Sequence, residues 1–445
     1  MVEFSIPRDL GGNLALRRAT RSDVDELVDF HGRILSSWEG ETEFRVGAWT
    51  RDLMTKPHPT FQVGDFTVVE DTTTRKIVSS MNLISQVWTY GGIPFKVGRP
   101  ELVGTHPDYR NRGLIRKQFE VIHHWSTERG ELVQAITGIP YYYRQFGYEM
   151  AMNLHGGRDG YLQHIPILDD GKPEPYVVRP VEEKDLPFIA KVYEQACQRS
   201  LVSCARDDTL WRYELCGKDK DNFNCLELRL IETPEGEAVG YLAHPSFRWG
   251  ATQVVFQYEV KAGISWSAVT PSVLRYLKSA GEALPPYQGQ EAWGSFAFIL
   301  GVSHPVYEVL PNSLPRVRRP YAWYLRVPDL PAFVRLITPV LEKRLATSPL
   351  ANHSGEIKLT FYRDGLRLVF EQGRIKEVES WTPFPQGNSG QAGFPGLTFL
   401  QLLFGYRSLD ELKCAFADCW TESDEDQALL STLFPKQASD VWPIS

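Results

Sequence analysis

The sequence predicts a mixed α/β fold arranged in three parts, two similar α/β units followed by an α+β unit. A pattern near the start, residues 15–30, returns at residues 177–192, which is an interval of domain size. From about Tyr321 the pattern changes, and a chain of 445 residues is also too long for one ordinary core. We therefore expect the three parts to span residues 1–170, 171–322 and 323–445.

The composition, 42% hydrophobic and 23% charged, is typical of a soluble globular protein. No apolar run approaches the roughly 20 residues of a membrane span, and the N-terminus lacks the basic and apolar regions of a signal peptide. The six cysteines show no zinc or disulfide spacing, so we expect a cytoplasmic protein without a metal. The net charge of -7 argues against nucleic-acid binding and favours a cationic small substrate.

The first unit is predicted to open with a strand, a polar turn and a helix. In "ALRRATRSDVDELVDF" a β-like run carries Arg17, the turn ends near Asp23, and apolar residues then recur at i, i+3, i+4 and i+7 from Val24. β-like segments at residues 60–71 and 76–106 follow, and then an arginine-rich loop, a helix and the run "ELVQAITGI". This order of strand, loop, helix and strand predicts a mixed α/β layer.

The second unit follows the same plan after the linker-like stretch "LDDGKPEPY". Arg179 and Asp185 take the places of the earlier arginine and aspartate, and helical spacing begins at Leu186. The runs "LELRLIET", "AVGYLAHPSF" and "ATQVVFQYEVKAG" predict strands, and "SAVTPSVLRYLKSAGEAL" predicts a helix.

The third part differs from both units. "LPAFVRLITPVLEKRL" predicts a helix, and "EIKLTFYRDGLRLVFEQGRIKEVESW" predicts three strands joined by turns at "RDG" and "EQG". "TFLQLLFGYRSLDELKCAF" predicts further helices. These elements make an α+β arrangement unrelated to the repeat.

The stretch "GTHPDYRNRGLIRKQF", residues 104–119, suggests a binding site. It places Arg110, Arg112 and Arg116 around the start of a helix, whose free N–H groups attract anions. Gly113 allows a bound group to approach the backbone closely. The residues alone leave two interpretations open, a phosphate-binding turn or a solvated basic turn, and the P-loop pattern of nucleotide triphosphatases does not occur.

This turn, the preceding "LVGTHPDY" and the opening "LRRATRSDVDEL" together resemble the GNAT acetyltransferases. Ile115 departs from the glycine or alanine that usually ends the family's turn. "NRGLIR" and "YRQFGY" are similar to motifs of a narrower group, the Eis-like (enhanced intracellular survival) acetyltransferases. That group has a catalytic GNAT domain, a degenerate second GNAT domain and a C-terminal domain like sterol carrier protein 2 (SCP2). The resemblance covers essentially the whole chain, with specific motifs in the first unit only.

The resemblance implies that acetyl-CoA is the co-substrate, held along a strand end and at the arginine-rich turn. The implied contacts are Val103, Gly104, Thr105, Arg110, Asn111, Arg112, Gly113, Leu114, Ile115, Arg116 and Thr137, which precedes Gly138. In the second unit the corresponding connection, "ISWSAVTPS", contains no arginine and no glycine. We therefore expect one acetyl-CoA site per chain.

The resemblance also implies the catalytic groups. The motif match selects Tyr143 as the general acid, since a tyrosine with a pKa of roughly 10 is protonated at neutral pH. The terminal carboxylate, here that of Ser445, is implied as the general base, although relatives commonly end in an aromatic residue.

The acceptor pocket is expected near "SSWEGETEF", where Trp38 and Glu39 are candidates for binding an amine and a solvated acidic loop is the alternative. The implied reaction moves an acetyl group to a primary amine, on an aminoglycoside, a polyamine or a lysine, by direct attack in a ternary complex. Relatives are homo-oligomers, and we expect neither a nucleic acid nor a membrane as partner. The competing hypothesis is a lipid-binding or scaffolding protein with a vestigial acetyltransferase domain, against which the intact turn and Tyr143 argue.

Overall fold

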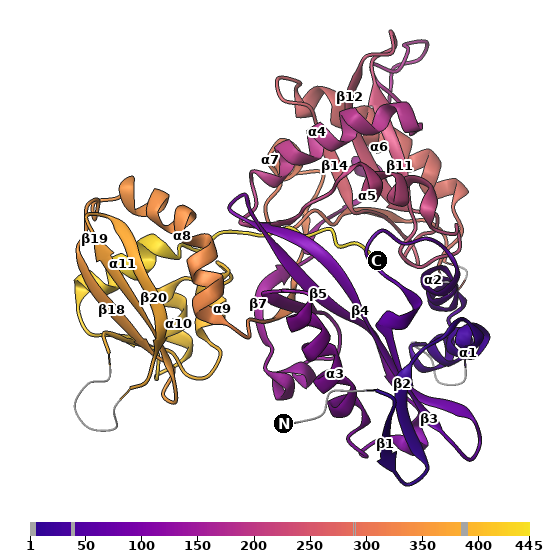
Figure 1. The fold of residues 1–445 in the computed structure, drawn as a ribbon. Helices are drawn as coiled ribbons and strands as arrows, with labels where there is room; N and C mark the ends of the chain where they lie inside the picture. Colours follow the sequence, from indigo (N-terminus) through magenta and orange to yellow (C-terminus); the bar gives the residue numbers. More distant parts are fainter. Residues whose placement is uncertain (1–5, 37–40, 288, 290, 384–389) are drawn as a thin grey trace.

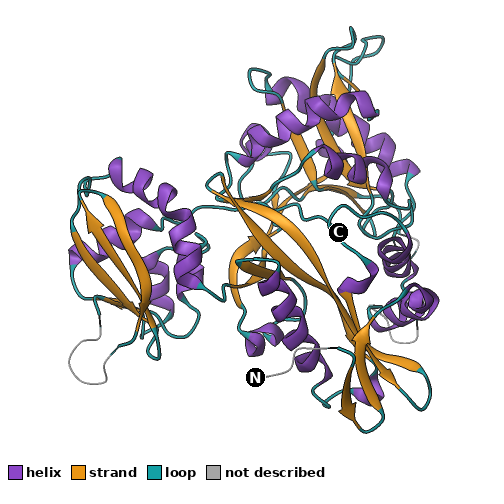
Figure 2. Cartoon of the chain, in the orientation of Figure 1, coloured by secondary structure: helices purple, strands orange, loops and turns teal. Residues whose placement is uncertain are grey.

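The computed structural model describes residues 6–36, 41–287, 289, 291–383 and 390–445. Figure 1 shows three parts in chain order, coloured indigo to purple, magenta to pink, and orange to yellow. Each part combines helices with a β-sheet, as Figure 2 shows. The predicted mixed α/β fold class is therefore confirmed.

The largest sheet has nine strands. In spatial order the path is β1 (Arg8–Gly11), β2 (Leu14–Arg18), β3 (Phe66–Asp71), β4 (Lys76–Tyr90), β5 (Ile93–Thr105), β6 (Val133–Ile136), β17 (Tyr321–Arg326) and β7 (Glu149–Leu154). The ninth strand, β10 (Val202–Cys204), pairs antiparallel with the far end of β4.

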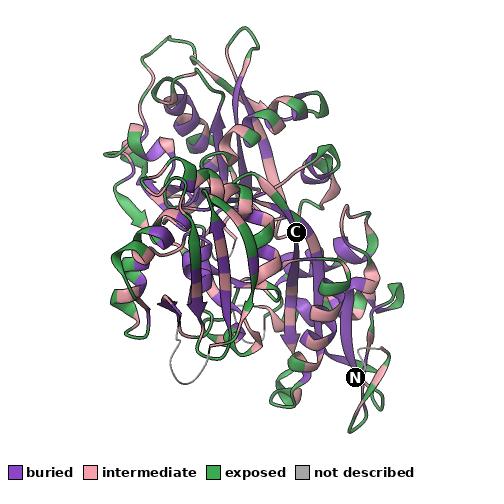
Figure 3. Cartoon of the chain, turned by 60° about the vertical axis from the view of Figure 1, so that its left-hand side comes forward, coloured by how far each residue is buried: buried purple, intermediate pink, exposed green. Residues whose placement is uncertain are grey.

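Helices cover both faces of this sheet. On β3, Val68 faces the side of α1 (Val24–Ile34) and α2 (Phe44–Thr55), and the next residue, Val69, faces the side of α3 (Leu114–Glu128). Because side chains alternate along a strand, a strand covered on both faces is apolar along its length. Figure 3 shows the result, with buried strands inside and exposed residues on the outer faces of the helices.

The second part contains two four-stranded sheets. The first has the order β14 (Gln257–Val260), β12 (Ala238–Pro245), β11 (Leu226–Glu232) and β9 (Val177–Pro180). The second has the order β13 (Thr252–Val255), β15 (Ser295–Phe298), β8 (Gly157–Tyr161) and β16 (Arg316–Arg318). The helices of this part are α4 (Leu186–Cys197), α5 (Asp208–Arg212), α6 (Trp266–Ala283) and α7 (Pro305–Val309).

The internal repeat extends to side-chain geometry. Arg17 bonds to Asp23 at 2.8 Å and through Nε to Glu70 at 2.8 Å. Arg179 bonds to Asp185 at 2.7 Å and through Nε to Glu232 at 2.9 Å. Each arginine thus joins the turn before a helix to a neighbouring strand, which explains why the two copies retain it.

Strand pairing connects the two repeated units. β17, which follows the second unit in sequence, inserts between β6 and β7 of the nine-stranded sheet. In the opposite direction, β8 leaves the first unit and pairs with β15 and β16. Neither sheet is therefore built from one continuous stretch of chain.

The third part packs helices against a five-stranded sheet. Its strands are β20 (Arg374–Trp381), β19 (Gly365–Glu371), β18 (Gly355–Thr360), β21 (Ala392–Gly393) and β22 (Trp420–Thr421), and its helices are α8 (Leu330–Ala346), α9 (Phe399–Leu403), α10 (Leu409–Ala415) and α11 (Asp424–Leu433). The predicted helix and the three predicted strands appear as α8, β18, β19 and β20. The core of this part continues into the β4–β5 hairpin, where Tyr90 donates a hydrogen bond to the Leu403 carbonyl.

After α11 the chain leaves the third part. Its last residues run back across the nine-stranded sheet and end between that sheet and the second part (Figure 1). Ile444 and Ser445 are both buried there. Within the described ranges, no helix is both long and apolar enough to span a membrane.

Candidate active site

The turn between β5 and α3 presents free backbone donors. Gly113 is the N-cap of α3 with φ 74°, and no side chain caps the helix there. Asn111, two residues earlier, also has a positive φ of 62°. The first N–H groups of an α-helix have no partner within the helix, so those at the start of α3 are available to an anion.

The arginines of this turn are exposed and carry uncompensated charge. Arg112 donates to the Asp108 carbonyl at 3.0 Å and Arg116 to Gln145 Oε1 at 3.0 Å, both neutral acceptors. Arg110 is similarly placed near the Thr105 carbonyl. Among the described residues, none of these guanidinium groups forms an ion pair with a carboxylate. Their charge, together with the helix N-terminus, suits a phosphate group.

Beside this turn, β5 and β6 pair over a short distance only. Their parallel register covers Val97 with Val133 and Gly98 with Gln134. Towards its end β5 also contains a bulge against β4, where Leu102 has φ 52°. The predicted contacts Val103, Gly104 and Thr105 lie in this last part of β5, beyond the pairing with β6. The backbone edge of β5 there is available to a bound chain molecule.

Beyond their short pairing, β5 and β6 leave a gap between them, and Tyr143 lies next to this gap in a cluster of aromatic rings. It is 4% exposed, and its ring contacts Phe119, Tyr142 and Tyr324. Burial raises the pKa of the Tyr143 phenol well above its usual value, and the Glu101 carboxylate raises it further. The hydroxyl is therefore protonated at every pH at which the protein would work.

A cavity of about 390 Å³ adjoins the gap between β5 and β6. Glu101 of β5 and Thr137, just after β6, line it from the nine-stranded sheet, and Trp323 lines it from β17. The second part supplies much of the opposite wall, and the C-terminal segment supplies the rest, including Ser445. The cavity therefore brings together groups from the first part, the second part and the last residues of the chain.

The last residues are held at this cavity by polar side chains. Tyr213 donates a hydrogen bond to the backbone oxygen of Ser445 at 3.1 Å. The Ile444 carbonyl accepts from Gln86 at 2.6 Å and from Arg99 at 2.8 Å. Ser445 is thus 5% exposed and fixed in place.

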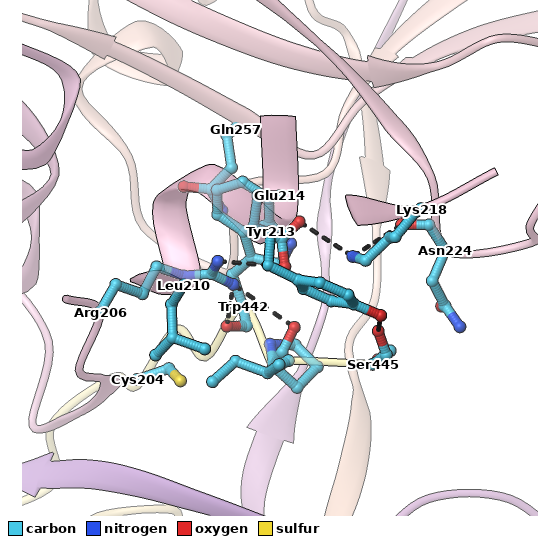
Figure 4. Close-up of polar contacts among 12 residues, drawn as sticks. Cys204, Arg206, Leu210, Tyr213, Glu214, Lys218, Asn224, Gln257, Trp442 and Ser445 are labelled. Carbon is cyan, nitrogen blue, oxygen red and sulfur yellow. Dashed lines mark hydrogen bonds and ion pairs between the residues drawn. The ribbon is translucent and has the colours of Figure 1, made fainter. Parts of the chain in front are cut away.

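A buried arginine anchors the same segment from the second part (Figure 4). Arg206 donates to the Trp442 carbonyl at 2.9 Å, and its guanidinium carbon lies 3.9 Å from the centre of the Trp442 ring. It also pairs with Glu214 at 3.2 Å, and Glu214 pairs with Lys218 at 2.9 Å. Burial opposes ionisation of Glu214, but the two cations hold its pKa below the usual value. A charged, hydrogen-bonded network therefore fixes the C-terminal segment.

Some predicted residues and some unpredicted ones share this site. Tyr143, Thr137 and Ser445 lie around the cavity and the neighbouring gap, whereas the arginine-rich turn lies outside the cavity. Trp38 and Glu39 lie outside the described residues. Glu101 was not predicted, although its acidic side chain interrupts the β-like run "FKVGRPELVGT" and is a signal that can be read from the sequence.

The comparisons with known proteins agree with this geometry. Residues 15–151 match the family described as "Acetyltransferase (GNAT) domain". The first part is thus an acetyltransferase domain. The expectation that the protein is an acetyltransferase is thereby confirmed. The matched residues include the arginine-rich turn, the β5–β6 gap and Tyr143. No curated protein matches the chain.

Solved structures share the fold over almost the whole chain. A conserved protein of unknown function from Enterococcus faecalis, a probable N-acyltransferase, has a TM-score of 0.65 at 14% identity, covering 96% of this chain and 97% of its own. A GCN5-related N-acetyltransferase from Kribbella flavida has a TM-score of 0.63 at 18% identity, and the likeness covers 96% of this chain and 97% of that one. Eis1 from Mycobacterium abscessus has a TM-score of 0.61 at 13% identity, and the likeness covers 97% of this chain and 99% of that one.

Replacing the anchor should release the C-terminal segment. Arg206→Met keeps Glu214 paired with Lys218 but removes charged hydrogen bonds, each contributing about 1.5–3 kcal/mol. We expect carboxypeptidase to remove Ser445 and Ile444 at least about tenfold faster than from the wild type, as measured by mass spectrometry. Arg212→Met, at an exposed arginine paired with Glu183, is the control. Release at the wild-type rate would show that Arg206 is not the anchor.

Proposed function

We propose that the chain is an acetyl-CoA-dependent N-acetyltransferase that acetylates a primary amine. In this proposal it has the Eis-like organisation, with a catalytic GNAT domain over residues 1–170, a degenerate GNAT domain over 171–322 and an SCP2-like domain over 323–445. The shared Arg17–Asp23 and Arg179–Asp185 geometry supports the assignment of the first two as related units.

The observation that carries the proposal is the contrast between the two units. In the first, three exposed arginines, which have no carboxylate partner in the described part of the chain, surround the N-terminus of α3. In the second, the helix α6 begins after Ser265, and the connection before it has no arginine. A charge cluster present in one copy of a repeated element indicates a ligand rather than a requirement of the fold.

The proposed reaction is direct attack of a neutral amine on the thioester. The pyrophosphate of acetyl-CoA binds residues 111–116, and the pantetheine arm follows the end of β5 between Val103 and Thr105. The amine nitrogen forms a bond to the acetyl carbon, and the carbon–sulfur bond breaks. The thiolate takes the proton of the Tyr143 hydroxyl, and the surplus proton of the nitrogen passes to a base.

The carboxylate of Ser445, the last residue of the sequence, is the proposed base. It lines the cavity and is fixed by Tyr213 at 3.1 Å. Glu101 is a second candidate, because it lines the same cavity next to the β5–β6 gap and burial raises its carboxyl pKa above the usual value. A carboxylate with a raised pKa is a better proton acceptor near neutral pH.

Acetyl-CoA binding tests the proposed function most directly. We expect calorimetry to show one site per chain, and the double change Arg112→Ala and Arg116→Ala to weaken binding at least about tenfold through lost phosphate contacts. Lys117→Ala is the matched control, since Lys117 lies on the same turn but is paired with Glu120. No binding by the wild type would favour the alternative, a lipid-binding protein, for which the cavity of about 360 Å³ beside Leu330 and Phe399 is the candidate site.

Removing the proposed acid should slow the chemistry and leave binding intact. Tyr143→Phe deletes the hydroxyl but keeps the ring that packs against Phe119 and Tyr324. We expect turnover to fall at least about 100-fold while the Kd of acetyl-CoA stays near the wild-type value. Tyr142→Phe, in the adjacent position, should change turnover little. Undiminished turnover in Tyr143→Phe would assign the proton to another group.

Two isosteric changes distinguish the candidate bases. A C-terminal carboxamide, introduced by protein ligation, neutralises Ser445 at constant size, and Glu101→Gln does the same at β5. If Ser445 is the base, the carboxamide lowers kcat/KM at least about 100-fold and removes the acidic limb of the pH profile, whereas Glu101→Gln has the smaller effect. The reverse order of effects would make Glu101 the base.

A further inference from the structure

The cavity beside the gap has few charges to offer a substrate. Its described ionisable groups are Arg99, Glu101, His155, Lys218, Asp440 and the carboxylate of Ser445. Arg99 and Glu101 pair with each other, and Lys218 pairs with Glu214 at 2.9 Å. Desolvation of the ring lowers the pKa of His155 to about 4 although the residue is exposed at its edge, so this ring is neutral.

Two carboxyl groups are left after this pairing. The backbone oxygen of Ser445, whose carboxylate is the proposed base, accepts a hydrogen bond from Tyr213, and Arg99 donates to the Ser445 hydroxyl at 3.4 Å. Burial, and then the nearby Glu259 carboxylate, raise the pKa of Asp440 to about 7. Beside the Arg99–Glu101 pair, the described wall thus presents Asp440, which is only partly ionised at neutral pH, and the Ser445 carboxylate that is proposed as the base.

Aromatic rings make up much of the remaining wall. They are Trp49, Phe223, Phe247, Trp249, Phe256 and Trp323, with Trp442 from the C-terminal segment. Trp249 and Phe256 pack edge to face with their centres 5.3 Å apart. Such faces bind apolar groups well, and they attract a single ammonium group through the ring quadrupole.

The same wall contains hydrogen-bond donors without partners. The indole N–H groups of Trp49 and Trp323 and the side-chain amide nitrogen of Asn224 are buried and find no acceptor among the described residues. These atoms are closed to solvent, so they add to the apolar character of the wall rather than to its polarity.

We propose that the acceptor is a primary monoamine on an aromatic or apolar body, rather than a polyamine or an aminoglycoside. This inference rests on the proposed acetyl transfer and specifies its substrate class. The amine binds next to the Ser445 carboxylate, its first proton passes to water, and the neutral amine attacks the thioester; the carboxylate then takes the surplus proton of the nitrogen. The ring of the substrate occupies the aromatic wall.

A polycation fits this cavity poorly. Every further ammonium group that enters loses its hydration, and only the partly ionised Asp440 carboxyl is left in the described wall to replace it. The volume of about 390 Å³ is also at the small end of ordinary ligand sites. Both charge and size therefore select a compact, singly charged amine.

A panel of amines tests the inference through acetyl-CoA-dependent thiol release. We expect kcat/KM for 2-phenylethylamine and tyramine to exceed that for spermidine and kanamycin A at least about 100-fold. Equal or greater activity with spermidine or kanamycin A would overturn the inference and leave the acetyltransferase function intact. If none of the amines of either class gives thiol release, the proposed function itself is overturned.

A change in the aromatic wall gives a second readout. Trp249→Ala removes a half-buried ring that packs only on its neighbour Phe256 among the described aromatic side chains. We expect KM for 2-phenylethylamine to rise at least about tenfold, with KM for n-butylamine and for acetyl-CoA changed less than about twofold. Tyr161→Ala, at an exposed aromatic outside the cavity, is the control. An equal rise for both amines would show that the ring does not recognise the aromatic body.

Discussion

The buried network of Arg206, Glu214 and Lys218 determines the form of the candidate active site. Its side chains are almost completely removed from water, so each charge depends on the others for compensation. The Nη2 group of Arg206 donates to two carbonyl groups of the C-terminal segment, those of Trp442 and Pro443. Because that segment is one wall of the cavity, the network helps to hold the cavity in shape, together with Tyr213, Gln86 and Arg99. The second unit thus contributes to the site by positioning, although its own helix α6 lacks the arginine-rich turn.

Local features were predictable from the sequence because they depend on neighbours in the chain. The helix α8 and the strands β18 to β20 follow from apolar periodicity and turn residues within a short window. The arginine-rich turn follows from spacing around Gly113, and Tyr143 was selected by its similarity to a family motif.

The cavity was not predictable in the same way. Trp323, Asn224 and Ser445 are remote from Glu101 in sequence, and no periodicity connects them. Arg206 reads in the sequence as one more surface arginine, and only its burial beside Glu214 gives it a different role. Contacts of this kind depend on how the units pack, which a single sequence does not encode in any local pattern.

The insertion of β17 has a consequence for how the protein is made. β7 pairs only with β17 in the described part of the sheet, and β17 is also the only neighbour on that side of β6. During synthesis, both strands leave the ribosome long before residues 321–326 do. Until then, the nascent chain carries two open strand edges, and such edges invite pairing with other chains. The residues that match the acetyltransferase domain are therefore continuous in sequence, but they do not make up its whole sheet. The sheet is complete only after the second unit and β17 have been translated.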